Sequence, residues 1–271
     1  MIDLRPFRVA PGAPLDLSDR DTDVDGGLKK DALDALHGEL TDRADELQER
    51  LYAEDERSVL FVLQAMDGAG KDSSIRKTFG PLNPQGVRVS SFKAPSKLEL
   101  SHDFLSRVHH KAPQRGLIRV FNRSHYEDVL IVKVHEWAPA DVIERRYDHI
   151  RHFEALLADA GTTVVKVMLH VSKDYQLERF RRRLRRPDKF WKFNPADLDE
   201  RELWDDYQRA YETALSRTST DAAPWYVVPA ENRDFRDAAL GSLLVQTLEA
   251  IDPQFPEPAF DPADYPPDAI Q

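Results

Sequence analysis

The sequence of 271 residues contains no cysteine, which excludes a disulfide framework and any metal site built on thiolates. It has no apolar run near the ~20 residues that span a bilayer, and its start, MIDLRPFRVAPG, lacks the apolar segment of a secretory signal. Lys and Arg (38) are outnumbered by Asp and Glu (48), so the net charge is −10. Because non-specific binding to nucleic acid depends on neutralising phosphates, this charge disfavours such a partner. We expect a soluble, cytoplasmic protein with no membrane or nucleic-acid partner, in which any polyanion site is a local cluster of cations.

Short apolar runs alternate with helical patterns along the chain. Runs with the composition of buried strands occur at 58–66, 87–92, 117–121, 163–171 and 225–228. Helical patterns cover 27–55, 96–110, 140–160, 173–186, 200–216 and 235–250. Strands that alternate with helices predict an α/β fold in three layers, with a five-stranded parallel sheet flanked by helices on both sides.

The two ends of the chain have the composition of surface segments. Residues 1–26 are polar and rich in Pro, Gly and Asp, and we expect an arm on the surface. From Asp252 onward the prolines predict an extended segment. Within 27–55 the apolar residues recur every three or four positions and form a narrow stripe: Leu33, Leu36, Leu40, Ala44, Leu47 and Leu51. This stripe either packs on its own domain or forms a surface for self-association.

A glycine-rich loop, MDGAGKDSS (66–74), joins the first predicted strand to a helix. That context is the one a phosphate-binding P-loop needs, and its backbone N–H groups from Gly68, Ala69, Gly70 and Ser73 could face an anion beside the charge of Lys71. The loop departs from the pattern G-x-x-x-x-G-K-[ST], because Ala65 replaces the first glycine and Asp72 the hydroxyl residue. The alternative is a plain glycine-rich connection.

Two carboxylates of this loop, Asp67 and Asp72, would repel a phosphate on their own. They make chemical sense when a divalent cation lies between them and the anion, since carboxylate oxygens are the ligands that Mg²⁺ prefers. The loop therefore predicts a site for phosphate and Mg²⁺, without identifying the phosphate donor.

Polar residues follow the third predicted strand in LIRVFNRSHYEDVLI (117–131). The carboxyl ends of parallel strands are where α/β folds bind ligands. Arg123 could bind phosphate oxygens with both arms of its guanidinium, or form a structural salt bridge. Glu127 and Asp128 are candidates for a metal-binding role of the Walker B kind, or for charges at a helix N-terminus. We expect His125 on the surface.

An arginine-rich segment, LERFRRRLRRPDKFWKFNPADL (177–198), lies between the fourth and fifth strands. On a helix Arg179, Arg182, Arg183 and Arg186 share one side, and Lys192 follows among aromatic residues. P-loop kinases carry their lid at this place, where arginines close over a transferring phosphoryl group. The alternatives are a solvated charged face and a nucleic-acid contact.

A looser group of cations lies between the second and third strands. Its members are Lys93, Lys97, Arg107, Lys111 and Arg115, with His109 and His110 among them. Together they could line a groove beside the loop.

Five motifs together resemble the polyphosphate kinase 2 family, most closely its third class. They are MDGAGKDSS, SFKAPSKLELSHDFLSRVHHKAP, VFNRSHYEDVL, DKFWKFNP and STDAAPWYVVPAENR, and the match runs from about residue 5 to 255. The resemblance implies a P-loop kinase core with a helical lid, and transfer of phosphoryl groups between inorganic polyphosphate and nucleotides with Mg²⁺ or Mn²⁺. It also implies AMP and ADP as acceptors, with guanine nucleotides as a further option, and a homo-oligomer, either a dimer or a tetramer. The family carries Asp at the position of Asp67 and Asp or Gly after the lysine, so the departures of the loop fit it.

The resemblance also implies the roles of the site residues. Asp67, Lys71, Arg123 and Asp128 match the family's motif positions, while the arginine run offers several registers, of which we choose Arg179 and Arg183. Asp67 and Asp128, with Glu127 as a further candidate, would hold the metal ion. Polyphosphate carries about one charge per phosphate and needs an extended cationic groove. The predicted phosphate-binding side chains and loop positions are Gly68, Ala69, Gly70, Lys71, Asp72, Ser73, Lys93, Arg107, Lys111 and Lys192.

We expect a single domain over residues 1–271. Its parts are an N-terminal arm and helix (1–57), a core with the loop and the metal-binding motif (58–171), a lid (172–200), a C-terminal core (201–251) and a proline-rich tail (252–271). The competing hypotheses are an ATP-dependent nucleotide or nucleoside kinase and, from another class, a P-loop protein that binds nucleic acid.

Overall fold

The centre of the structure is a parallel sheet of five strands in the order β2-β3-β1-β4-β5. This computed structural model describes residues 1–266. The strands are β1 (Ser58–Ala65), β2 (Val87–Ser91), β3 (Ile118–Asn122), β4 (Thr162–His170) and β5 (Trp225–Pro229). Each lies within one residue of its predicted range. The predicted five-stranded parallel sheet is therefore confirmed.

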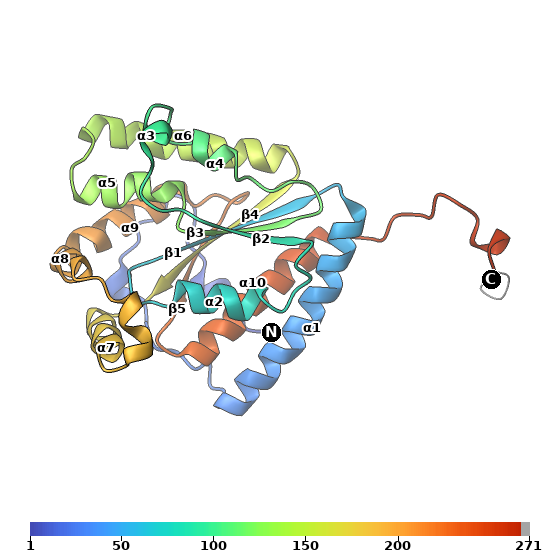
Figure 1. Cartoon of the computed structure of the whole chain (residues 1–271), viewed down its shortest axis with the longest axis horizontal. Helices are drawn as coiled ribbons and strands as arrows, with labels where there is room; N and C mark the ends of the chain where they lie inside the picture. The colour runs from blue at the N-terminus through green and yellow to red at the C-terminus, as the bar shows by residue number, and fades with distance from the viewer. Residues whose placement is uncertain (267–271) are drawn as a thin grey trace.

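Helices cover both faces of the sheet, which gives three layers (Figure 1). One face is covered by α1 (Lys30–Glu54), α2 (Lys71–Phe79) and α10 (Arg233–Ile251), and the other by α5 (Ile131–Val134), α6 (Ala140–Asp159) and α9 (Trp204–Thr218). The shorter helices are α3 (Lys97–Leu100), α4 (Ser106–His109), α7 (Lys173–Leu184) and α8 (Ala196–Glu202), with 3-10 turns η3 (His125–Val129) and η4 (Pro187–Lys192). In the described part of the chain, no helix is both long and apolar enough to cross a bilayer.

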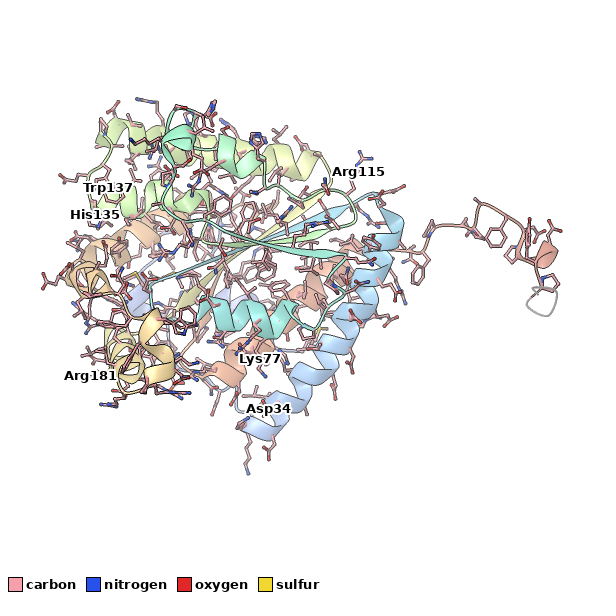
Figure 2. All side chains as sticks on the ribbon, viewed as in Figure 1. Asp34, Lys77, Arg115, His135, Trp137 and Arg181 are labelled. Atoms are coloured by element: carbon pink, nitrogen blue, oxygen red, sulfur yellow. The ribbon has the colours of Figure 1, made fainter. Side chains whose placement is uncertain are left out.

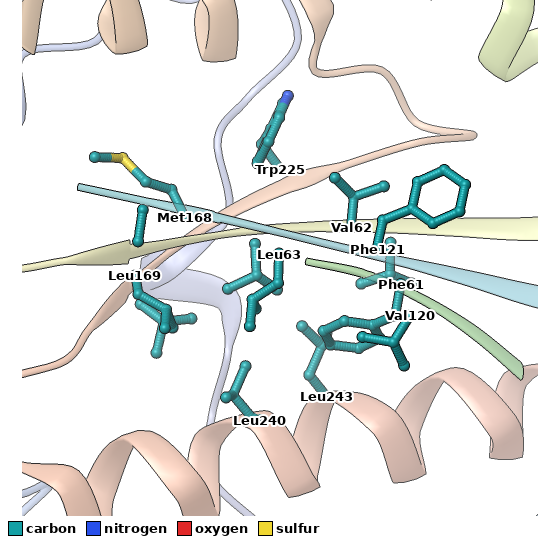
Figure 3. Packing of buried hydrophobic residues seen from close by; sticks show 14 of the residues in the cluster. Phe61, Val62, Leu63, Val120, Phe121, Met168, Leu169, Trp225, Leu240 and Leu243 are labelled. Atoms are coloured by element: carbon teal, nitrogen blue, oxygen red, sulfur yellow. The ribbon is translucent and has the colours of Figure 1, made fainter. Parts of the chain in front are cut away.

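The core forms where the apolar strands meet α10. All eight residues of β1 are buried, as expected for a central strand covered on both faces. Figure 3 shows Leu240 and Leu243 of α10 beneath side chains of β1 and β3, with Trp225 of β5 across the sheet. Most residues of α10 are buried, because α1 covers its outer side.

The apolar stripe of α1 packs on its own chain. Leu33, Leu40, Ala44 and Leu47 are at most 4% exposed, and the helix lies along α10. Packing within the domain is thus the correct interpretation, and the stripe is not a free surface for self-association. The N-terminal arm follows the surface as expected but inserts apolar side chains. Val9, which donates from its N–H to the Trp225 carbonyl at 2.8 Å, is 2% exposed.

The predicted helix over 96–110 is wrong. The structure has two short helices there, α3 and α4, because the Asp103 side chain accepts hydrogen bonds from the N–H groups of Leu105 and Ser106. Such local bonds compete with the helical ladder. The pattern over 200–216 is likewise divided between α8 and α9.

The prediction that His125 lies on the surface is also wrong, since its ring is only 1% exposed. Its Nε2 lies 3.3 Å from Glu154 Oε1, inside a buried polar network between η3, α6 and β4. At its centre Lys166 Nζ lies 2.5 Å from Glu154 Oε2 and 3.0 Å from the Tyr126 hydroxyl. The network anchors the first two residues of η3, whose next two residues are Glu127 and Asp128.

Candidate active site

The glycine-rich loop occupies the carboxyl edge of β1 and leads into α2. Gly68 (φ 91°) and Gly70 (φ 104°) both adopt left-handed backbone conformations, which glycine enters at no steric cost. A Cβ on Gly70 would lie 2.6 Å from Arg236 Nη1. The loop therefore requires glycine at position 70 both for its backbone angle and for its close approach to α10.

Lys71, the first residue of α2, points back across the loop. Its side chain is 9% exposed, and its Nζ donates to the Ala65 carbonyl at 2.7 Å and lies 3.8 Å from Asp67 Oδ1. Burial lowers the pKa of Lys71, against the pull of Asp67. Ala65, which stands where the usual P-loop pattern has its first glycine, thus supplies the carbonyl oxygen that binds Lys71.

Arg123 bridges the loop to the segment after β3. Its Nη2 lies 2.8 Å from Asp67 Oδ1, and its Nη1 lies 3.3 Å from Glu127 Oε2. The residue has a φ of 61°, a left-handed conformation that costs a non-glycine residue free energy. Burial acts to raise the pKa of Asp67, but Lys71 and Arg123 together hold it below its ordinary value. The row Lys71, Asp67, Arg123 and Glu127 is the electrostatic centre of the site.

Asp128 lies beside a different cation. Its Oδ1 is 3.4 Å from Arg146 Nη1, which also donates to the Asp128 carbonyl at 2.8 Å. Burial raises the pKa of Asp128 to about 6, despite the opposing charges of Arg146 and Arg107. Glu127, and not Asp128, is the neighbour of Arg123.

The carboxylates of Asp67, Glu127 and Asp128 fit a hard divalent cation in their chemistry, because all three present oxygen donors. Burial raises the pKa of Asp128, so a cation bound beside it would favour its charged form. Among the described residues, no three His, Asp or Glu side chains converge closely enough to form a metal site by themselves. Substrate oxygens and water would have to complete the coordination, as is usual for Mg²⁺ at phosphate sites.

The arginine-rich segment 177–198 folds as the end of α7, then η4 and the start of α8, and α7 packs directly on the loop. Gln176 Nε2 donates to the Asp67 carbonyl at 2.8 Å, and a Cβ on Gly68 would lie 3.3 Å from Gln176. Of the six arginines only Arg179 and Arg183 are partly shielded, while Arg181, Arg182, Arg185 and Arg186 are exposed. Arg183 pairs with Asp197 at 3.1 Å and is close enough to help lower the pKa of Asp67. Burial thus distinguishes the two predicted arginines from the rest.

Asp72 faces the turn after α7. Its Oδ1 accepts from Asn122 Nδ2 at 2.9 Å, and its Oδ2 lies 3.9 Å from Lys192 Nζ of η4. The neighbouring Ser73 hydroxyl donates to the Gly70 carbonyl at 2.7 Å. In this arrangement Asp72 joins the loop, β3 and the basic segment.

The cations between β2 and β3 do not form one group. Arg107 donates to the Lys93 carbonyl at 2.9 Å, lies over Phe92 and helps to set the pKa of Asp128, so these two residues border the site. In the described part of the chain, no hydrogen bond or ion pair joins the Lys111 side chain to the loop, and His109 packs on Phe153. Arg115 lies at the opposite edge of the sheet (Figure 2), next to Gly116, which bonds the Arg57 carbonyl. It cannot line a groove beside the loop.

Three contacts of the site escaped the sequence analysis. Arg236 of α10 is 2% exposed, pairs with Asp237 at 2.7 Å and lies against Gly70. Asn122 and Gln176 hold Asp72 and Asp67 in place. No local pattern marks any of them, because each is defined by a partner far away in the sequence.

Comparison with known proteins places this geometry in context. The family model described as Polyphosphate kinase 2 matches residues 27–256. An AMP/ADP-polyphosphate phosphotransferase of Meiothermus ruber is 49% identical over 259 residues, which cover 94% of this chain and 96% of the relative. An ADP-polyphosphate phosphotransferase of Rhodopseudomonas palustris is 42% identical over 273 residues, with 94% and 93% covered. The crystal structure of a polyphosphate kinase 2 from Arthrobacter aurescens TC1 superposes with a TM-score of 0.93 at 43% identity, covering 96% of this chain and 93% of that one.

Proposed function

Because this chain belongs to the polyphosphate kinase 2 family, we propose that its site transfers phosphoryl groups between inorganic polyphosphate and adenine nucleotides, AMP or ADP, in a reversible reaction. The observation that carries the proposal is the row Lys71, Asp67, Arg123 and Glu127 at the mouth of the glycine-rich loop. It combines fixed cations for phosphate oxygens with carboxylates that fit a metal ion. The hypothesis of an ATP-dependent nucleotide kinase is not favoured by the relatives.

The acceptor is a phosphate oxygen that is already ionised at neutral pH, so the reaction needs no strong general base. Catalysis then consists of aligning the two substrates and neutralising charge in a loose, in-line transition state. Lys71 and the N–H groups of the loop hold phosphate oxygens, while Arg123 neutralises the transferring group. Its present partners, Asp67 and Glu127, orient the guanidinium.

A divalent cation, Mg²⁺ or Mn²⁺, would supply further charge neutralisation at the phosphates. Asp67 and Asp128 are the residues that would hold it, with Glu127 as the third candidate. Asp67 Oδ1 lies next to the charged groups of Lys71 and Arg123. To bind the metal ion, the Asp67 carboxylate would have to give up part of its contact with these two cations.

Residues 172–200 would act as the lid over this site. Arg179 and Arg183 are the partly shielded arginines of the segment, and Lys192 reaches Asp72 of the loop. Lys93 and Arg107 border the site on the other side and would hold a stretch of polyphosphate, with Lys111 further along the chain. The same proposal includes acceptance of guanine nucleotides and a homo-oligomeric state. It also includes the division of the chain into the five parts given above and a cytoplasmic location.

Phosphorus NMR tests the proposed activity. Protein incubated with polyphosphate, ADP and Mg²⁺ should consume the polyphosphate signal and produce ATP, and AMP should replace ADP as an acceptor. The matched control is Lys71→Met, which removes the charge of a buried side chain and should abolish transfer while circular dichroism shows an intact fold. A persistent polyphosphate signal with transfer only from ATP would establish the ATP-dependent kinase instead. Duplex DNA that stays bound at physiological salt would support the nucleic-acid hypothesis.

A further inference from the structure

The C-terminal segment after α10 is unlike the rest of the surface. Residues 252–266 contain five prolines and four carboxylates but no Lys or Arg. Three large aromatic side chains of this segment are exposed, namely Phe255 (59%), Phe260 (57%) and Tyr265 (61%). Figure 1 shows the segment leaving the body beside the C-terminal end of α1 and projecting away from it. Exposed aromatic residues on a stiff, proline-rich segment are typical of a recognition element.

Within the described residues, the tail contacts the body of the protein at its base. Arg57 Nη2 donates to the Asp252 carbonyl at 3.3 Å, and Phe255 lies 6.0 Å from the Arg50 guanidinium. Further along, Phe260 and Tyr265 pack against each other edge to face, with ring centroids 5.5 Å apart. This aromatic pair, flanked by Asp261 and Asp264, makes no other aromatic contact in the described structure.

A groove that complements the acidic, aromatic tail in its apolar and charged groups lies elsewhere on the molecule. It is a hollow of about 700 Å³ between the segment 102–109 and the outer side of α6. Its apolar floor is formed by Phe104, Phe153 and Leu156, of which Leu156 is 54% exposed. Its volume lies within the roughly 300–1,000 Å³ of pockets that hold compact organic groups.

The polar groups of the groove are mostly cationic or hydrogen-bond donors. The Arg145 side chain is 60% exposed and, among residues 1–266, pairs only with the exposed Asp141 on its own helix, a contact of little energetic value. Arg146, which pairs with Asp128, also lines the groove. The other polar groups are four imidazoles, from His102, His109, His149 and His152, and a single carboxylate, Asp103, whose Oδ1 already caps the turn before α4.

We propose that the aromatic pair Phe260 and Tyr265 of one copy of this chain docks in the groove between 102–109 and α6 of a second copy. The rings bury apolar surface on Phe104, Phe153 and Leu156, and Asp261 and Asp264 face Arg145 and the imidazoles. Each copy carries one tail and one groove, so two copies related by a twofold axis satisfy both pairs and close the assembly. The apolar stripe of α1 is covered by α10 and does not compete for this role.

A second copy fits better than the chain's own tail because of where the tail begins. It starts beside α1 and α10, on the opposite face of the sheet from α6, and points away from the groove (Figure 1). Opposite charges on the tail and the groove also raise the rate at which two copies meet and the specificity of their contact.

Engineered cysteines test the contact cleanly, since the chain has none of its own. Ala263→Cys, between the two rings of the tail, and His152→Cys, at the groove, are purified as separate full-length proteins, mixed and oxidised, and resolved on a non-reducing gel. We expect a covalent heterodimer as the main product. The control mixture pairs Ala263→Cys with Leu198→Cys, which is 44% exposed on α8 and outside the groove, and should give only background. No excess over that background overturns the proposal. A variant that carries both cysteines in one chain is oxidised in parallel. If the cross-link forms only within that single chain, the groove binds the chain's own tail and the proposal is overturned.

Light scattering over a concentration series provides the second measurement. The pair Phe260→Ala and Tyr265→Ala should weaken the dimer roughly 30-fold or more, as expected for the loss of a buried aromatic anchor, whereas Gln254→Ala should leave it unchanged. Arg145→Glu should weaken it as well, and Asp261→Arg with Asp264→Arg should restore it. This docking is ruled out if none of these substitutions changes the dissociation constant of the dimer. It is also ruled out if the chain is monomeric at the concentration used for cross-linking.

Discussion

Arg123 Nη2 lies 2.8 Å from Asp67 Oδ1, and Arg123 holds this contact from a left-handed backbone with a φ of 61°. A non-glycine residue pays about 1–2 kcal/mol for that conformation. The surrounding contacts, including the bond from the Arg123 N–H to the Leu63 carbonyl at 3.1 Å, impose it. Backbone strain therefore coincides with the proposed catalytic centre.

Replacing Arg123 by glycine tests the effect of backbone strain on stability separately from the role of the guanidinium in catalysis. Arg123→Gly relieves the backbone but leaves Asp67 and Glu127 without their shared partner, so the free energy of unfolding should change by less than about 1 kcal/mol. Turnover should fall about 10²–10³-fold, the usual effect of losing one preorganised charge contact. Urea denaturation and phosphorus NMR measure the two quantities. Near-normal turnover would remove Arg123 from the mechanism, and Arg123→Lys should retain an intermediate rate.

Arg183 in α7 and Arg185, which directly follows this helix, form a matched pair for testing the proposed lid. Arg183 is partly shielded and lies near Asp67, whereas Arg185 is exposed and pairs only with Glu178. Arg183→Ala should raise the barrier by roughly 3 kcal/mol, about a hundredfold in rate, with little change in stability. Arg185→Ala should leave both unchanged. Equal effects from the two variants would show that the wrong register was chosen.

Two glycines make a similar pair for the loop. A Cβ on Gly70 would meet Arg236 Nη1 at 2.6 Å and its φ is 104°, whereas a Cβ on Gly38 in α1 meets no atom within 4 Å. Gly70→Ala should destabilise the protein and weaken phosphate binding. Gly38→Ala should stabilise it by roughly 0.5–1 kcal/mol, since it removes a glycine from a helix interior. Thermal unfolding of both variants checks this, and an unperturbed Gly70→Ala would contradict the strained geometry of the loop.

The buried pair Lys166 and Glu154 should respond differently to single and double replacement. Both side chains are at most 2% exposed, with Nζ 2.5 Å from Oε2. Lys166→Met leaves an unpaired buried carboxylate and should cost about 3–5 kcal/mol of unfolding free energy. Adding Glu154→Leu should recover most of that loss, as chemical denaturation can show. A double variant as unstable as the single one would mean that the hydrogen bonds to Tyr126 and His125, and not the charges, dominate.

His170 should contribute a pH dependence to stability. It is 5% exposed and donates from Nε2 to the Leu17 carbonyl at 3.0 Å. Burial lowers the pKa of His170, although the backbone groups of Leu17 and Arg20 and the charge of Glu231 favour the protonated form. The unfolded state therefore binds a proton first as the pH falls below about 6.5, so stability falls with pH in that window. In His170→Gln the loss of stability between pH 7 and 5, measured in urea, should be smaller. An equal loss would assign the dependence to other groups.

The site illustrates how far local patterns reach. The strand–loop–helix context of Gly68, Gly70 and Lys71 was predictable because it lies within a dozen consecutive residues. The choice of Arg179 and Arg183 among six arginines became supported only when α7 was seen packed on the loop, with the other four exposed. His125 was misplaced because nothing beside it in the sequence indicates Glu154, 29 residues away.

The sequence by itself determined the five strands, the main helices and the glycine-rich loop, since apolar runs, helical periodicity and glycine spacing are encoded within short segments. Tertiary structure alone decided that Arg123 binds Asp67 and Glu127, that Arg236 closes on Gly70, that Arg115 lies at the far edge of the sheet, and that Lys166 is buried with Glu154. Each of these depends on segments far apart in the chain that meet only when the parallel sheet brings its strand ends and covering helices together.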